Sequence, residues 1–86
     1  MVKLPYNYYL QADKHQIILC TKREKGERYD TRGYYTTLIG ALHGWRKMVT
    51  RDIINTDNIQ SMNEIITELR KLNEQAEEII ARIEVN

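Results

Sequence analysis

The residues best suited to chemistry in this chain are cationic and aromatic, and they gather between residues 22 and 35. The candidate partner-binding set is Lys22, Arg23, Lys25, Arg28, Tyr29, Arg32 and Tyr34. Guanidinium and ammonium groups bind phosphates, and tyrosine rings stack on bases or fill pockets in a protein surface. The set therefore indicates a binding surface. The alternative is a solvated hairpin, whose charges mainly confer solubility.

The sequence shows no constellation for catalysis or metal binding. His15 falls in a predicted turn and His43 in a predicted helix, and either could pair with Cys20 on paper. Lone histidines and a single buried cysteine are, however, common in ordinary folds. The sequence also lacks a phosphate-cradling glycine loop, a nucleophile elbow and metal-ligand spacing. We therefore expect neither an enzyme nor a bound cofactor.

Length and composition set the class of protein. A chain of 86 residues predicts a single domain, residues 1–86. Its one cysteine excludes an intramolecular disulfide and fits a reducing compartment. No apolar run approaches the roughly 20 residues that span a bilayer, and the N-terminus lacks the apolar segment of a signal peptide. These features predict a cytoplasmic protein that does not contact membranes.

Charge is distributed unevenly along the chain. Residues 1–56 hold ten Lys and Arg against five Asp and Glu, a net charge of +5. Residues 57–86 hold three against seven, a net charge of −4. The two parts could attract each other within one chain or between chains, and the basic part could meet a phosphate-bearing partner.

Three predicted strands would position the basic and aromatic residues. The strand segments are residues 6–12, 16–23 and 28–35, after a lead-in that ends at Pro5. The middle segment contains a continuous apolar run, which is typical of a strand buried on both faces. Gly26 is free to adopt positive φ in the second turn, and Gly33 predicts a bulge or bend. We expect a three-stranded antiparallel meander, in which a one-residue error in register would move every tyrosine to the other face.

Two predicted helices follow, over residues 37–54 and 61–84, where the apolar period changes from two to 3.6. Thr37 is the predicted N-cap of the first helix. Ser61 and Glu64 have the spacing of a capping box at the start of the second. The short connection makes the two helices antiparallel neighbours. The predicted fold class is therefore α+β, in the order βββαα.

Gly40 and Gly44 lie one turn apart inside the first predicted helix. Each costs about 1 kcal/mol relative to alanine in a helix interior. That cost predicts that another backbone packs closely against this face, from the second helix or from the sheet. The alternative is that an exposed surface tolerates both glycines.

The second helix predicts self-association. At 1.5 Å per residue it is about 36 Å long, whereas a domain of this size is about 30 Å across. The candidate self-association residues are Leu72, Ala76, Ile79, Ile80 and Ile83. Another copy would cover this apolar stripe, most simply in a two-fold dimer. The alternative is a monomer in which the sheet curls under the last turns.

One stretch carries a resemblance to known proteins. Residues 33–42 read Gly-Tyr-Tyr-Thr-Thr-Leu-Ile-Gly-Ala-Leu, and Arg51-Asp52-Ile53 and the capped second helix follow. This pattern resembles short, mostly uncharacterised proteins encoded by phages and prophages of Gram-positive bacteria. Those share a basic hairpin, an aromatic pair, a Thr/Ser-Leu-x-x-Ala helix start and a Glu/Lys-rich final helix; Gly40 departs from the helix-favouring residue that is usual there. The resemblance implies a phage accessory protein of the host-takeover or anti-defence kind, and it transfers no site residues.

We therefore expect a non-enzymatic interaction protein that acts as an oligomer and blocks a surface of a host or phage macromolecule, in the first place a protein. Two alternatives remain open. A nucleic-acid-binding module using the basic hairpin would bind with strong salt dependence and would weaken when Arg28 or Arg32 is changed to alanine. An oligomeric sponge for a nucleotide signal would show a ligand-dependent rise in melting temperature.

Overall fold

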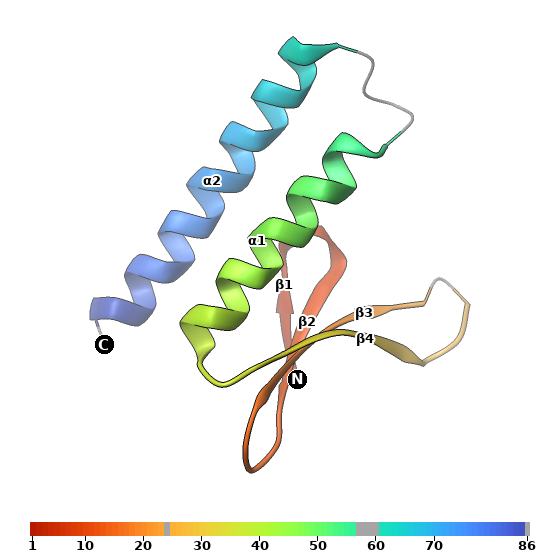
Figure 1. Ribbon diagram of the computed structural model, residues 1–86, viewed down its shortest axis with the longest axis vertical. Coiled ribbons are helices and arrows are strands. Elements are labelled where there is room, and N and C mark those ends of the chain that lie inside the picture. The colour runs from red at the N-terminus through yellow and green to blue at the C-terminus, as the bar shows by residue number, and fades with distance from the viewer. Residues whose placement is uncertain (24, 57–60, 86) are drawn as a thin grey trace. The chain divides into compact units, whose positions relative to one another are not determined.

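The computed structural model describes residues 1–23, 25–56 and 61–85. The elements, in chain order, are β1 (Val2–Leu4), η1 (Pro5–Asn7), β2 (Tyr8–Ala12), β3 (Ile17–Lys22), β4 (Tyr29–Tyr35), α1 (Leu38–Ile54) and α2 (Met62–Val85) (Figure 1). The fold class is α+β, as predicted. The chain divides into two compact units, Met1–Trp45 and Arg46–Asn86, with the boundary inside α1. The single domain therefore stays a prediction.

The sheet has four antiparallel strands in the order β1-β2-β3-β4, so the prediction of three strands is wrong. The missed strand is Val2–Leu4, which pairs with β2. Between the two strands the chain reverses through η1, where Tyr6 and Asn7 both adopt a φ of 65°. A bulky side chain rarely takes that left-handed conformation. The strand-forming residues of the 6–12 segment therefore gave no sign of the reversal.

β3 lies inside the sheet, as predicted from its apolar run. Its neighbours Leu19 and Cys20 point to opposite faces and are 0% and 2% exposed. β4 carries a bulge opposite them, because Leu19 pairs with Gly33 while Cys20 pairs with Thr31. The irregularity predicted at Gly33 is confirmed, and Arg32 is the extra residue. Gly26 also has the predicted positive φ, of 97°.

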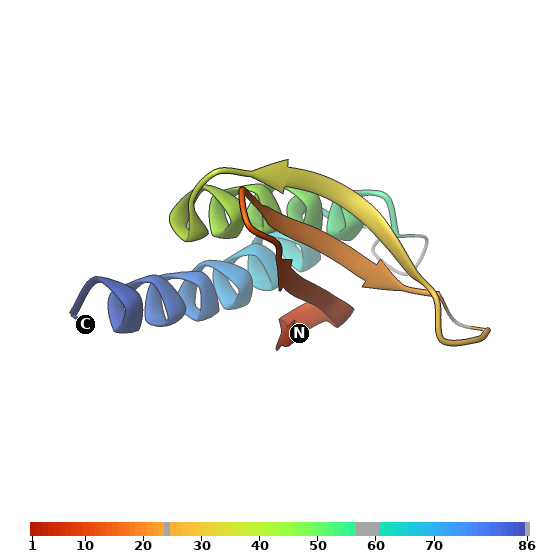
Figure 2. The same cartoon turned by 90° about the horizontal axis from the view of Figure 1, so that it is seen from below.

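The first turns of α1 lie against one face of the sheet (Figure 2). The helix begins as predicted, since the Gly40 amide donates to Thr37 Oγ1 at 3.0 Å. Further along, the fully buried Trp45 donates from Nε1 to the Pro5 carbonyl at 3.1 Å. This bond ties the helix to the turn between β1 and β2. The buried apolar residues of the unit are Leu4, Tyr8, Leu10, Leu19, Cys20, Ala41, Leu42 and Trp45.

The second unit is a helical hairpin in which the end of α1 and α2 run antiparallel (Figure 1). Ser61 Oγ accepts the Glu64 amide proton at 3.2 Å, which confirms the N-cap of α2. The reciprocal bond from Glu64 stays a prediction. The first helix was predicted to end at residue 54, and α1 ends at Ile54; of the connection that follows, residues 57–60 lie outside the described residues.

The buried apolar residues of the second unit are Val49, Ile53, Leu72 and Ala76. A polar contact joins its two helices, because Arg46 Nε and Nη2 both donate to Asn73 Oδ1, at 2.9 and 2.6 Å. The buried Val49 and Ile53 confirm the apolar periodicity predicted for the end of the first helix. The apolar stripe predicted for the second helix is buried at Leu72 and Ala76 and partly exposed at Ile79, Ile80 and Ile83.

Candidate functional site

The register assigns every strand residue to one of two faces. Residues directly opposite each other on antiparallel strands have side chains on the same face. One face holds the buried Tyr8, Leu10 and Leu19, and the first turns of α1 lie against it. We call the other the open face. It consists of Lys3, Tyr9, Gln11, Ile18, Cys20, Lys22, Tyr29, Thr31 and Tyr34.

The bulge at Arg32 decides which tyrosines reach the open face. Tyr29 and Tyr34 are five positions apart, so in a regular strand they would point to opposite faces. The extra residue shifts the alternation by one and brings Tyr34 back to the face of Tyr29. The same shift turns Tyr35 toward α1. Tyr29 is 38% exposed and Tyr34 60% exposed, so both rings are accessible.

Two rings of the open face touch each other. Tyr9 and Tyr29 have ring centroids 5.2 Å apart and an interplanar angle of 81°, an edge-to-face contact. Tyr9 comes from β2 and Tyr29 from β4, and β3 lies between these strands. The rings therefore meet over β3. This places an aromatic pair on the open face, toward the end at which β4 begins.

Cys20 lies on β3, between the strands of that aromatic pair. It is 2% exposed, and its thiol donates to the Tyr9 carbonyl at 3.5 Å. Burial raises the pKa of the Cys20 thiol. The thiol form is therefore favoured over the thiolate, which is the form that acts as a nucleophile or metal ligand.

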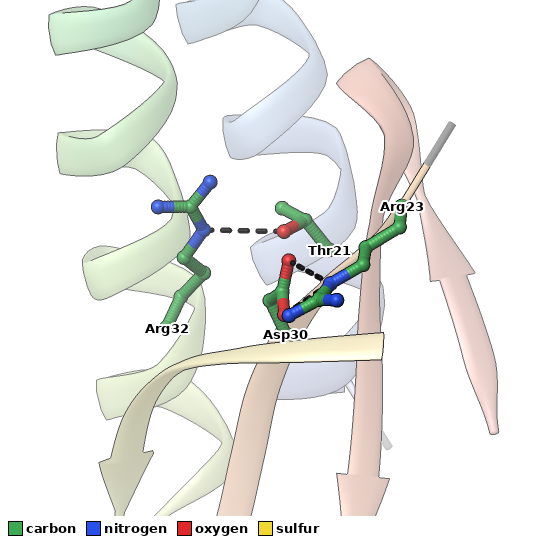
Figure 3. A network of polar contacts seen from close by, with 4 residues as sticks. All are labelled: Thr21, Arg23, Asp30 and Arg32. Atoms are coloured by element: carbon green, nitrogen blue, oxygen red, sulfur yellow. Dashed lines mark hydrogen bonds and ion pairs between the residues drawn. The ribbon is translucent and has the colours of Figure 1, made fainter. Parts of the chain in front are cut away.

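The structure divides the predicted partner-binding set among three places. Lys22, Tyr29 and Tyr34 lie on the open face. Arg23 and Arg32 extend from the opposite side of the hairpin (Figure 3). The remaining two members, Lys25 and Arg28, are exposed in the turn between β3 and β4. The set predicted as one basic surface is therefore not one surface.

The two arginines on the covered side have polar partners there (Figure 3). Arg23 Nε donates to the carboxylate of Asp30, at 2.9 Å to Oδ1 and 3.2 Å to Oδ2. Arg32 Nε donates to Thr21 Oγ1 at 3.1 Å. The Arg23–Asp30 ion pair has side chains 56% and 43% exposed, so it contributes only about 0–1 kcal/mol. The pairing of Asp30 with Thr21 puts the Asp30 carboxylate on the face opposite to the open face.

Two aromatic or cationic residues of the open face, Tyr9 and Lys3, are absent from the predicted partner-binding set. Tyr9 was assigned to a strand but to no face, and only its pairing with Cys20 places it beside Tyr29. Lys3 was missed because β1 was read as a lead-in. A pairing pattern between residues 2–4 and 8–10 would have placed Lys3 on the face of Tyr9.

The residues predicted for self-association differ in their exposure. Leu72 and Ala76, proposed for self-association, are 0% and 1% exposed, so they have no surface to offer another copy. Ile79, Ile80 and Ile83 keep an intermediate exposure. In the described part of the chain, no group of three or more His, Cys, Asp or Glu is placed to hold a metal ion.

Comparison with known proteins gives no relative. The sequence matches no protein-family model, and neither the curated proteins nor the solved structures contain a significant match. Among the described residues, neither helix is long and apolar enough to span a membrane.

Proposed function

We propose that the chain is a non-enzymatic interaction protein of phage or prophage origin, which acts by occupying a surface of a host or phage macromolecule with the open face of its sheet. Anti-defence or host takeover are roles of this kind. The observation that supports this best is the bulge at Arg32, which puts Tyr34 on the same face of the sheet as the contacting pair Tyr9 and Tyr29. Tyrosine combines a large apolar ring with a polar tip, and it is enriched in binding surfaces.

The experiment compares tagged variants in a capture assay on host-cell lysate. Tyr29→Ala and Tyr34→Ala are expected to lose the captured macromolecule. The matched control is Ile66→Ala, because Ile66 is an apolar side chain 42% exposed on α2, outside the sheet. Loss of capture in the Ile66 variant, with full capture by both tyrosine variants, would move the binding surface to the helices.

We also propose that the chain self-associates through the end of α2. The proposal is supported by three partly exposed side chains, Ile79, Ile80 and Ile83. It does not include Leu72 and Ala76, because both are buried. Sedimentation velocity on wild-type protein and on Ile83→Glu tests the proposal. A wild-type dimer that the substitution converts to a folded monomer is the expected result, and a wild-type monomer at micromolar concentration contradicts it.

A further inference from the structure

We propose that the open face binds single-stranded nucleic acid, with bases stacked on Tyr9, Tyr29 and Tyr34 and with phosphates contacted by Lys3 and Lys22. This inference rests on the proposed function and names the chemistry of the partner. It differs from binding through the basic hairpin, because Arg23 and Arg32 lie on the other side of the sheet and take no part.

The spacing of the rings suits an extended strand of nucleotides. Every base presents a flat π-face, so exposed rings bind successive bases with little sequence preference. The Tyr9–Tyr29 pair forms one platform and Tyr34 a second. With strand residues 3.3–3.4 Å apart, the two platforms are separated by about 15 Å along β4. A strand that reaches both must therefore contribute more than one nucleotide.

The charge of the face complements phosphate. Lys3 and Lys22 are exposed on it, and none of its nine residues is acidic. Asp30, the nearest acid on β4, belongs to the opposite face and pairs with Arg23. The sequence from residue 1 to 45 holds seven Lys and Arg against four Asp and Glu, a net charge of +3. Cationic side chains interleaved with aromatic rings are the pattern that tracks a nucleic-acid backbone.

The composition of the face favours nucleic acid over a protein partner. The buried core of a protein interface is mostly apolar, and Ile18 is the one aliphatic side chain on this face. A sheet four strands wide is also a poor fit to the grooves of a duplex, whereas unstacked bases of a single strand can lie on it.

Fluorescence anisotropy with labelled 12-nucleotide oligo-dT, oligo-rU and a DNA duplex tests the proposal at 50 and 200 mM NaCl. Wild-type protein is expected to bind a single strand more tightly than the duplex, and less tightly at the higher salt. Tyr34→Ala should weaken binding by about five- to 150-fold, the factor that corresponds to 1–3 kcal/mol per stacked base. Tyr34→Phe keeps the ring and should bind like wild type. Lys22→Ala should reduce the slope of log K against log salt by about 0.7.

Arg32→Ala is the matched control, since it removes a cation from the opposite side of the same strand and should leave the affinity within twofold. No binding at 50 mM NaCl overturns the inference, and so does binding that Arg32→Ala abolishes while Tyr34→Ala leaves it intact. If oligonucleotides fail to bind but both tyrosine variants lose a captured protein, this inference fails and the proposed function stands. If the tyrosine variants change neither readout, both fail.

Discussion

The phenol ring of Tyr35 occupies the space that a Cβ atom on Gly44 would take. The ring also lies against Gly33, where a Cβ atom would come within 2.8 Å of the hydroxyl oxygen. Gly44 was predicted to allow the close approach of another backbone. It allows the close approach of the Tyr35 side chain instead. The Tyr35 ring therefore packs against both Gly33 of β4 and Gly44 of α1.

Gly44→Ala should therefore destabilise the protein, although alanine is the better helix former. Overpacking a filled site costs about 1–3 kcal/mol, against a gain of about 1 kcal/mol in helix propensity. The same substitution in a Tyr35→Leu background should be neutral or stabilising, because the obstructing ring is gone. Urea denaturation of the four proteins of this cycle gives the coupling energy. Equal effects of Gly44→Ala in both backgrounds would contradict the contact.

Trp45→Phe should lower the free energy of unfolding by about 1–3 kcal/mol beyond the loss of ring volume. The substitution removes the Nε1–H group that donates to the Pro5 carbonyl. This partly buried carbonyl oxygen then loses its hydrogen bond from Trp45. Circular dichroism during urea denaturation measures the change. Hydrogen exchange should locate the loosening at β1 and β2, and protection that falls evenly along the whole sheet would argue against this bond as the cause.

The contrast between Tyr34 and Tyr35 shows where sequence reasoning stops. The strand that contains them was predicted, and so was an irregularity at Gly33. A bulge position cannot be fixed from the pattern of one strand, because it depends on which partner residues stay paired. Here the pairing of Leu19 with Gly33 and of Cys20 with Thr31 decides that Tyr34 is exposed on the open face and that the half-buried Tyr35 points toward α1.

Elements with a strong local signal were predicted, and elements that depend on distant pairing were not. Thr37 and Ser61 cap their helices through bonds to residues three positions away, which a short stretch of sequence specifies. By contrast, β1 is three residues long and exists through its pairing with β2. Leu72 lies on the predicted apolar stripe, and the periodicity alone could not tell an internal contact from an intermolecular one.

Asp13 should make the turn between β2 and β3 sensitive to acid. Its Oδ1 accepts the amide protons of His15, at 2.8 Å, and Gln16, at 2.9 Å. The bond from the His15 amide is the main cause that lowers the pKa of this carboxyl, and the bonds from Gln16 add to it. Because folding lowers the pKa of Asp13, its carboxylate stabilises the protein at pH values above the unfolded pKa of about 3.8. This stabilisation is lost as the pH falls through the folded pKa.

Asp13→Ala should accordingly melt at a lower temperature than wild type at pH 7, and the difference should shrink at pH 2, where the protonated carboxyl is only an uncharged acceptor. Thermal melts at the two pH values measure this. Asp13→Asn keeps an uncharged acceptor and should show an intermediate melting temperature at pH 7. A wild-type advantage that persists unchanged at pH 2 would mean that the carboxylate is not its source.

Asn73→Ala should destabilise the helical hairpin. The Asn73 carbonyl accepts two bonds from the charged Arg46 guanidinium in a partly buried position. Hydrogen bonds to charged groups contribute about 1.5–3 kcal/mol, so a loss of that order is expected in urea denaturation. Gln75→Ala, an exposed position on the same helix, is the matched control and should change stability by less than about 0.5 kcal/mol. Equal losses in the two variants would assign the effect to the helix rather than to Arg46.

Cys20 should report directly on the aromatic pair above it. Its buried thiol has a raised pKa, so native protein should react with a thiol reagent such as DTNB at least about tenfold more slowly than protein in guanidinium chloride. Folding raises the pKa of the Cys20 thiol, so the stabilisation linked to the protonated thiol is complete below the unfolded pKa of about 9.0. This stabilisation is lost as the pH rises through the folded pKa. Tyr29→Ala removes the ring contact with Tyr9 and should accelerate the reaction, whereas Tyr34→Ala, further along β4, should not. Equal acceleration by both substitutions, with unchanged thermal stability, would show that a general loosening of the sheet and not the Tyr9–Tyr29 pair controls access to the thiol.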